Sequence, residues 1–207
     1  MISRDDPVVL VDHDWGSALS FDRANHHHDR VRAIVYMEAI VCPLGWSEWP
    51  EGSRRLFQGF RSATGEELIL DKNMFVERVL PASILRTLEP AGMAEYRRPF
   101  TNLPEDRWPT LASPREIPIG GEPLAVVEVV TAYAHWMTEN DIPKLFVNAE
   151  PGAILVGPQH EFCRQWRNQT EVTVKGSHFL QEDSGWEVGE AIASWAEQHV
   201  IAPKGRR

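Results

Sequence analysis

The chain has 207 residues, of which 43% are hydrophobic and 25% charged, as is usual for a globular protein that buries one sizeable core. Its formal net charge of −9 argues against a nucleic-acid partner, because binding phosphates requires clustered positive charge. Two cysteines are too few for a disulfide framework, and no apolar stretch is long enough to span a bilayer. Residues 1–7 are too polar for a signal peptide, and we interpret the basic end at 204–207 as a solvated tail. A cytoplasmic protein is therefore expected.

Strand and helix patterns alternate at both ends of the chain. A short β-branched run at 8–11 is typical of a fully buried strand, and the helix predicted next has Leu19, Phe21 and Ala24 as its apolar positions. The predicted strands lie at 8–11, 31–37, 144–149 and 171–174, and the predicted helices at 16–28, 125–137, 158–166 and 187–199. This alternation predicts an α/β protein in which a four-stranded, mostly parallel sheet is flanked by helices.

The middle of the chain, residues 42–120, differs from both ends. It is rich in Trp, Phe, Arg and Pro, and prolines at this density cut helices short and fix turns. A helical insert between two strands predicts a cap over the carboxyl ends of the sheet, although a separate helical domain would give the same pattern. We therefore divide the chain into a core at 1–41, a helical cap at 42–120 and a second part of the core at 121–207.

Three polar residues follow predicted strands. Asp14 lies in His13-Asp14-Trp15-Gly16, where a strand turns sharply into a helix, as in a nucleophile elbow. Taken alone, Asp14 could equally cap that helix. Glu38 comes directly after the second strand, and His178 comes between the last strand and the last helix. The order nucleophile, acid, histidine is the order of a catalytic triad in α/β-hydrolases.

Other acids and histidines allow further interpretations. Glu150 follows the third predicted strand, and position alone does not separate it from Glu38 as the acid of a triad. His26, His27 and His28 look like a metal cluster, but three adjacent helical residues point in three directions, so a solvated helix end is expected. Asp12 lies on the first strand, two residues before Asp14, where a buried carboxylate is costly and should raise one of the two pKa values.

At the level of whole segments, the chain resembles the C-terminal two-thirds of a haloalkane dehalogenase, in the subfamily whose catalytic acid follows the sixth strand. The matching segments are His13-Asp14-Trp15-Gly16-Ser17-Ala18-Leu19, Met37-Glu38-Ala39-Ile40, Phe57-Gln58-Gly59-Phe60-Arg61-Ser62, Asn73-Met74-Phe75-Val76-Glu77, Tyr96-Arg97-Arg98-Pro99-Phe100, Pro143-Lys144-Leu145-Phe146, Asn148-Ala149-Glu150-Pro151-Gly152 and His178-Phe179-Leu180-Gln181-Glu182-Asp183.

The resemblance implies the chemistry of each residue. Asp14 would displace halide from a haloalkane and form an alkyl ester on its own carboxylate. His178 would activate the water that cleaves this ester, with Glu38 orienting the imidazole, and this favours Glu38 over Glu150 as the acid. The indole N–H of Trp15 would bind the departing halide. The reaction needs a halogenated alkane and water, and no metal or organic cofactor.

The resemblance also implies a substrate pocket and some departures from the family. Five residues match pocket positions, although they would otherwise be interpreted as core packing: Phe57, Phe75, Pro114, Ile117 and Ile154. Ser83 stands at the pocket mouth, where relatives often have a larger apolar residue, so a wider or more polar entrance is expected. The His-Gly-Asn-Pro segment that supplies an oxyanion N–H and a halide-binding Asn in the family has no counterpart here, so we expect an N-terminally truncated member. Its first strand would be an open sheet edge that favours self-association.

Three alternatives to a working dehalogenase remain at this stage. One is an inactive, truncated remnant of such an enzyme. A second is an epoxide hydrolase, which shares the Asp–His–acid residues but grips the epoxide oxygen with two cap tyrosines, whereas Tyr96 is the only tyrosine of the predicted cap. The third is a relative of the coelenterate luciferases, which share both the fold and the triad.

Overall fold

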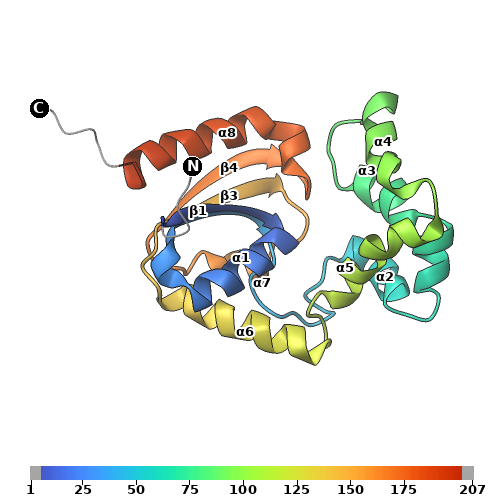
Figure 1. Ribbon diagram of the computed structural model, residues 1–207, viewed down its shortest axis with the longest axis horizontal. Helices are drawn as coiled ribbons and strands as arrows, with labels where there is room; N and C mark the ends of the chain where they lie inside the picture. The colour runs from blue at the N-terminus through green and yellow to red at the C-terminus, as the bar shows by residue number, and fades with distance from the viewer. Residues whose placement is uncertain (1–5, 202–207) are drawn as a thin grey trace, which may run out of the picture. The chain divides into compact units, whose positions relative to one another are not determined.

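The computed structural model describes residues 6–201, so residues 1–5 and the basic end at 204–207 lie outside the described part of the chain. The chain divides into two compact units. One unit comprises the chain up to Cys42 and from Glu128 onward, and the other comprises Pro43–Val127. The first unit contains a β-sheet, and the second is built from short helices (Figure 1).

The sheet of the first unit has four strands in the order β1-β2-β3-β4, and every neighbouring pair is parallel. The strands are β1 at Val8–Asp14, β2 at Val31–Ala39, β3 at Lys144–Pro151 and β4 at Gln169–Gly176. All four predicted strands are confirmed, and each is longer than predicted. Because the strands are parallel, their carboxyl ends lie at the same edge of the sheet.

Helices cover both faces of this sheet (Figure 1). One face is covered by α8 at Leu180–His199, which packs on β3 and β4. On the other side lie α1 at Trp15–His26, α6 at Leu124–Glu139 and α7 at Pro158–Cys163, and a short 3-10 helix, η1, spans His28–Arg30. The helix α6 runs across the boundary between the two units.

The two faces have different cores. Beneath α8 the contacts are mainly aliphatic, with buried residues such as Val35, Leu145 and Val188. On the opposite face the contacts are aromatic, and Phe21 of α1 makes edge-to-face contacts with Tyr36 of β2 at 5.7 Å and with Tyr133 of α6 at 5.6 Å. Such aromatic pairs stabilise the packing of helices on the sheet beyond the area that they bury.

The first strand is not fully buried, contrary to the prediction. Val9 is 38% and Val11 52% exposed, although their register partners Ala33 and Val35 on β2 are buried. The reason is that β1 lies at the edge of the described sheet, while α8 packs on β3 and β4. Leu19 was likewise predicted as an apolar contact but is 71% exposed, because α1 turns Ser17, Phe21 and Ala24 toward the sheet instead.

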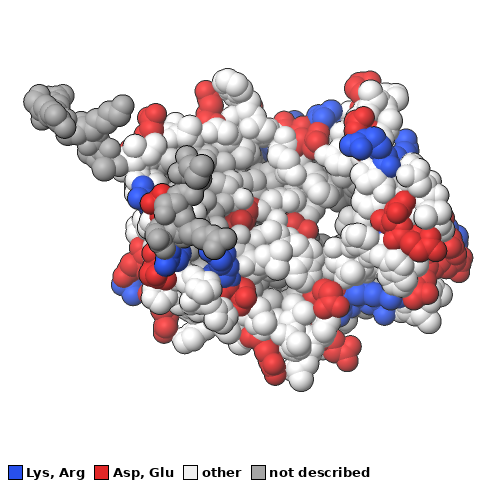
Figure 2. All heavy atoms as spheres, viewed as in Figure 1, with Lys and Arg blue, Asp and Glu red and all other residues white. Residues whose placement is uncertain are grey.

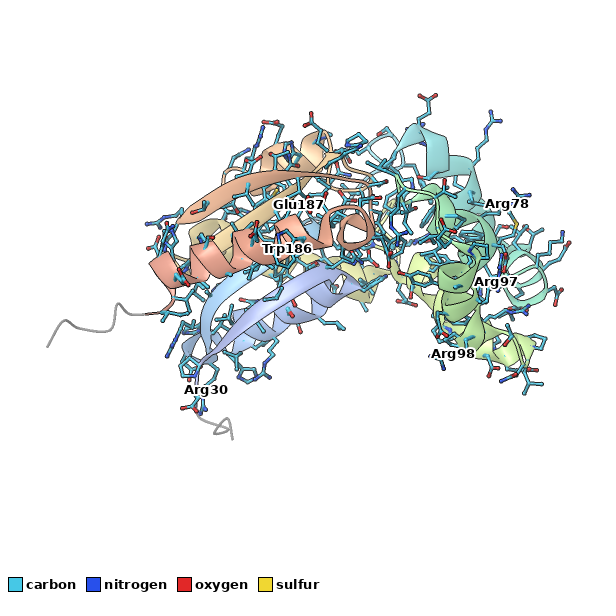
Figure 3. The ribbon with its side chains drawn as sticks, turned by 90° about the horizontal axis from the view of Figure 1, so that it is seen from above. Arg30, Arg78, Arg97, Arg98, Trp186 and Glu187 are labelled. Carbon is cyan, nitrogen blue, oxygen red and sulfur yellow. The ribbon has the colours of Figure 1, made fainter. Side chains whose placement is uncertain are left out.

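The last helix begins earlier than the sequence predicted. It starts at Leu180 rather than near Glu187, with a non-helical residue, Ser184, inside it. The hydroxyl of Ser184 donates a hydrogen bond to the Lys175 carbonyl at 2.6 Å, so the irregular turn is fastened to β4. Trp186, two residues beyond the kink, is 77% exposed (Figure 3).

The second unit consists of short helical segments, many of which begin with a proline in their first turn. In chain order these are α2 at Glu51–Phe60, the π-helices η2 at Glu67–Asp71 and η3 at Phe75–Val79, α3 at Leu80–Ala82, α4 at Pro90–Arg97, the 3-10 helices η4 at Arg98–Phe100 and η5 at Pro104–Arg107, and α5 at Trp108–Glu116. Arg97, labelled in Figure 3, forms a two-pronged ion pair with Glu77 that joins α4 to η3.

The surface charge follows the acidic composition. On the face seen in Figure 2, acidic side chains are scattered among uncharged ones, and basic side chains occur in small groups. Within residues 6–201, no helix is both long enough and apolar enough to cross a membrane.

Candidate active site

Asp14 is the last residue of β1 and the residue before α1. Its backbone lies in the left-handed region, with a φ of 48°, which is uncommon for any residue but glycine and marks a sharp turn. The side chain makes no capping hydrogen bond to α1 and is 33% exposed. The geometry therefore favours an elbow that presents the carboxylate over a helix cap.

Ser17, three residues further on, fastens this elbow to the next strand. The Ser17 side chain is fully buried, and its hydroxyl donates a hydrogen bond to the Asp14 carbonyl. The same oxygen accepts the backbone N–H of Ile40, just beyond β2, at 3.0 Å. The turn at Asp14 is thus fixed relative to the end of β2.

Glu38 lies close to the end of β2 and is 1% exposed. Its backbone φ is positive, 41°. In the pairing of β1 with β2, His13 lies opposite Met37 and Asp14 lies opposite Ala39, so Glu38 has no partner residue on β1. An extra residue in one strand is a β-bulge, which bends the strand locally and re-aims a side chain. The bulge turns the Glu38 carboxylate toward the carboxyl ends of the other strands.

His178 follows β4 by two residues, and it contacts both acids. Its Nδ1–H donates to Glu38 Oε2 at 3.3 Å, and its Nε2 lies 3.8 Å from Asp14 Oδ1. With Nδ1 protonated, Nε2 carries the lone pair on the side of Asp14. The structure thus brings together the three residues that the sequence predicted as a triad, from three different strand ends.

The carboxylate of Glu38 is held in its ionised form. Burial by itself raises the pKa of Glu38, but the hydrogen bond and the charge of His178, together with two backbone N–H donors, outweigh burial and hold the pKa below its ordinary value. The two donors are Ile154, at 2.9 Å from Oε2, and Ala153, at 3.2 Å. A buried acid in this state is an anion at neutral pH.

His178 has the opposite shift. Burial by itself lowers the pKa of the imidazole, but the hydrogen bond to Glu38 and the charges of Asp14 and Glu38 raise it above its usual range. The neighbouring His13 donates its Nε2–H to the His178 carbonyl at 2.7 Å, and burial together with the charge of His178 lowers the pKa of His13. The pKa values of the two neighbouring histidines are thus shifted in opposite directions.

The other predicted site residues lie in both units. Trp15 is half-buried at the first position of α1, and Ile154 is half-buried in the loop after β3. The remaining pocket candidates belong to the second unit, where Phe57, Pro114 and Ile117 are buried and Phe75 and Ser83 are half-buried. Phe57 contacts Trp49 there at a ring distance of 4.9 Å.

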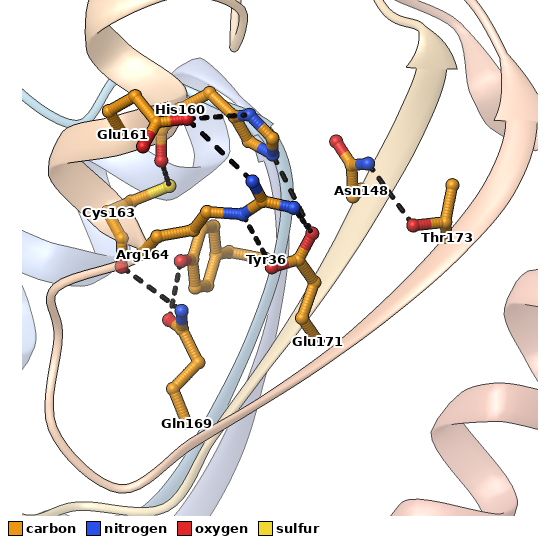
Figure 4. Close-up of polar contacts among 9 residues, drawn as sticks. All are labelled: Tyr36, Asn148, His160, Glu161, Cys163, Arg164, Gln169, Glu171 and Thr173. Carbon is orange, nitrogen blue, oxygen red and sulfur yellow. Dashed lines mark hydrogen bonds and ion pairs between the residues drawn. The ribbon is translucent and has the colours of Figure 1, made fainter.

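Glu150, the alternative acid, belongs to a different surface. It is exposed and lines a polar depression of about 360 Å³ together with Asn148, Thr173, His160 and Arg164. Figure 4 shows the polar contacts near this depression, in which the Arg164 guanidinium binds Glu171 at 2.7 and 2.8 Å, and the Asn148 amide donates to Thr173 at 3.2 Å.

The histidine run at 26–28, at the end of α1, lies at the surface of the first unit. His26, His27 and His28 are all exposed, as a solvated helix end would be. Among residues 6–201, no group of three or more His, Cys, Asp or Glu side chains is arranged to hold a metal ion.

Comparison with known proteins places the chain in a family. No family model matches the chain. The structure is similar to the crystal structure of a haloalkane dehalogenase from Bradyrhizobium elkani, with a TM-score of 0.89 and 40% sequence identity over 95% of this chain and 69% of that one. The chain belongs to the haloalkane dehalogenase family. Its four parallel strands and flanking helices match part of the α/β-hydrolase fold of these dehalogenases.

Curated relatives agree with this assignment. A haloalkane dehalogenase from Sphingobium indicum is 57% identical over 193 residues, which are 93% of this chain and 65% of that protein. A coelenterazine h 2-monooxygenase from Renilla reniformis is 40% identical over 199 residues, which are 92% of this chain and 62% of that protein. The chain therefore spans a little under two thirds of the length of these curated relatives.

Sequence reasoning missed the groups that hold the predicted triad in place. The N–H groups of Ala153 and Ile154 have no side-chain signature, and only the Pro151-Gly152 pair at the end of β3 signals a tight turn there. Ser17 was part of the matching segment, but its link to Ile40 depends on two strands that are adjacent only in the folded chain. For His13, the sequence shows only its position before Asp14, which does not predict its hydrogen bond to the His178 carbonyl.

Proposed function

We propose that this chain carries the residues that hydrolyse a carbon–halogen bond in a haloalkane, with Asp14 as nucleophile, His178 as base and Glu38 as the acid that orients the base. The observation that carries the proposal is the imidazole of His178, which lies between the two carboxylates at 3.3 Å from Glu38 and 3.8 Å from Asp14. This arrangement supports nucleophilic catalysis by a carboxylate, followed by hydrolysis.

In the first step, a carboxylate oxygen of Asp14 attacks the carbon that bears the halogen. The new carbon–oxygen bond forms as the carbon–halogen bond breaks, and halide leaves with the bonding electrons. The product is an alkyl ester on Asp14, and no proton moves. The indole N–H of Trp15, next along the chain, is a donor without acceptor capacity and would stabilise the departing halide.

In the second step, water attacks the carbonyl carbon of this ester. Nε2 of His178 takes a proton from the water, and the anionic Glu38 stabilises the imidazolium that forms. The ester then collapses to the alcohol and restores the Asp14 carboxylate, and one proton is released overall. The raised pKa of His178 supports its role as proton acceptor in this step.

We further propose that the alkyl group of the substrate is bound by the residues that match pocket positions of the family. These are Ile154, Phe57, Phe75, Ser83, Pro114 and Ile117. All but Ser83 are apolar, as suits an alkyl chain.

Two variants test the two-step scheme. Asp14→Ala should abolish halide release from a 1-bromoalkane, because no carboxylate remains to form the ester. His178→Phe should instead trap the ester, which mass spectrometry detects as an added mass equal to the alkyl group of the substrate. The absence of this adduct in a folded His178→Phe protein that binds substrate would refute the scheme.

The resemblance to the Renilla reniformis coelenterazine monooxygenase supports a second candidate function, oxidation of a coelenterazine-like substrate with emission of light. Luminescence on adding coelenterazine h, with no halide release from any of a series of 1-chloroalkanes and 1-bromoalkanes, would favour this candidate. Halide release that depends on Asp14 would favour the dehalogenase.

We also propose that the described chain associates with a second copy of itself through β1. This strand pairs with β2 on one side, and it exposes Val9 and Val11 to solvent on the face toward α8. An exposed apolar edge strand is a template for pairing with another strand.

A further inference from the structure

The turn at residues 151–154, where the chain leaves β3, packs against the carboxylate of Glu38. The N–H of Ile154 donates to Glu38 Oε2 at 2.9 Å, and the N–H of Ala153 lies 3.2 Å from both carboxylate oxygens. Two consecutive N–H groups that point at one carboxylate form a small anion-binding concavity. Since Glu38 is 1% exposed, these donors take the place of water around the anion.

Gly152 allows the turn to approach the Glu38 carboxylate closely, because it has no side chain. Its φ is +70°, a conformation that side chains rarely adopt, and a Cβ placed there would lie 3.2 Å from Glu38 Oε1 and 3.0 Å from the Ala149 carbonyl oxygen. Any side chain at this position would therefore push the turn, the carboxylate or both out of place.

The same glycine links the turn to the strand that carries the histidine. The N–H of Gly152 donates to the Gly176 carbonyl at 3.0 Å, at the end of β4 and two residues before His178. The turn thus contacts the acid through Ala153 and Ile154 and the histidine strand through Gly152. A single short segment sets the distance between the two groups.

We infer that the turn at 151–154 positions the acid of the triad, and that Gly152 is a positioning residue for the reaction of the proposed function, on which this inference rests. Glu38 keeps its charge and its distance from His178 because the turn supplies two donors and leaves no room for a side chain. The turn that follows β3, the strand that carries the alternative acid Glu150, thus contributes backbone donors to the site.

The imidazole of His178 reports on this arrangement without any substrate. Its titration depends on Glu38 from β2, Asp14 from β1 and the adjacent His13, also from β1. An opposite charge within hydrogen-bonding reach raises the pKa of a histidine by ~1–3 units. If the carboxylate of Glu38 is displaced, the pKa of His178 must fall.

The matched variants are Gly152→Ala and Gly157→Ala. Gly157 also has a positive φ, +56°, but a Cβ there would meet nothing within 4 Å, so this control adds the same kind of backbone strain without touching Glu38. In NMR titrations of the full chain, with the His178 signal assigned by its loss in His178→Gln, we expect Gly152→Ala to lower the pKa of His178 by ~1 unit. Gly157→Ala should leave it unchanged.

An unchanged pKa of His178 in folded Gly152→Ala, or an equal fall in both variants, would overturn the inference. Both measurements are made without dehalogenation, so a failure of this inference can be distinguished from a failure of the proposed function.

A second measurement serves if Gly152→Ala does not fold. The amide proton signals of Ala153 and Ile154 should move upfield in Glu38→Gln, because the amide oxygen that replaces the carboxylate is a weaker acceptor. The same signals should not move in Glu150→Gln, which changes an exposed acid near the end of β3, just before the turn. Signals that stay in place in Glu38→Gln would show that these N–H groups do not bind the carboxylate, and the inference would be wrong.

Discussion

Asp12 is an acid on the side of β1 that faces α1, and we expect its replacement by Asn to stabilise the protein at neutral pH. Its Oδ1 accepts the hydroxyl of Ser20 at 2.6 Å, whereas Oδ2 is buried and has no hydrogen-bond partner. The substitution Asp12→Asn would keep the shape of the side chain and the acceptor for Ser20 while removing the charge. A buried carboxylate with one unsatisfied oxygen is costly, whereas a neutral amide costs less.

The size and sign of the effect follow from the pKa of Asp12. Burial raises this pKa from 3.8 to about 6, against a smaller opposing effect of the Ser20 hydrogen bond. Between these pH values the folded state keeps a proton that the unfolded state has lost, so the free energy of unfolding falls as the pH rises through this window. The full shift corresponds to about 3 kcal/mol, and solvent screening at a half-buried group reduces this to about 1–2 kcal/mol.

Urea unfolding of the wild type and Asp12→Asn at about pH 4 and about pH 7.5 measures this difference. The pKa of Glu38 is lowered, so its contribution to the free energy of unfolding is lost as the pH falls. Both proteins contain Glu38, and its contribution therefore cancels in the difference between them. Asp71→Asn, which changes an exposed acid, serves as the control. A gain for Asp12→Asn that is equal at both pH values, or absent at neutral pH, would show that burial of the Asp12 charge does not destabilise the fold.

Three further predictions concern the site and the sheet edge. Glu38→Gln should reduce halide release far more than Glu150→Gln, because only the first acid contacts His178; the reverse ranking would assign the acid to β3. Ser17→Ala should lower the free energy of unfolding by about 2 kcal/mol, because it leaves the Ile40 N–H buried without an acceptor; an unchanged urea midpoint would contradict this. Val11→Lys should reduce self-association in sedimentation velocity, because a charge on an edge strand opposes pairing, and undiminished association would exclude β1 as the interface.

The sheet could be predicted from the sequence because its strands carry a strong and local signal. The run at 31–37 is built from β-branched and apolar residues, and in β2 every residue except Arg32 is buried. The alternation of such runs with helical segments allows few arrangements other than a parallel sheet with helices on both faces. The exposure of Val9 and Val11 could not be predicted in the same way, since it depends on which strands α8 covers.

The contact between Glu38 and His178 was harder to predict from residue patterns. Glu38 and Glu150 both follow buried strands, so position alone left them equivalent. What separates them is the bulge at Glu38, visible only when β1 and β2 are paired, and the alternation of β3, which buries Ala149 and exposes Glu150. Resemblance to a known family favoured Glu38, and the contact between Glu38 and His178 agrees with that preference.

Residues with a positive φ occur at three of the strand ends near His178. Asp14, Glu38 and Gly152 have φ values of 48°, 41° and 70°, all in the left-handed region. A non-glycine residue in this region costs on the order of 1–3 kcal/mol and persists only where the surroundings fix it. Here each strained residue is held by bonds from another strand end: the turn at Asp14 by Ser17 through Ile40, and Glu38 by the turn at Gly152. Because these constraints come from separate strands, relaxing any one of them should move the His178 imidazole relative to both carboxylates.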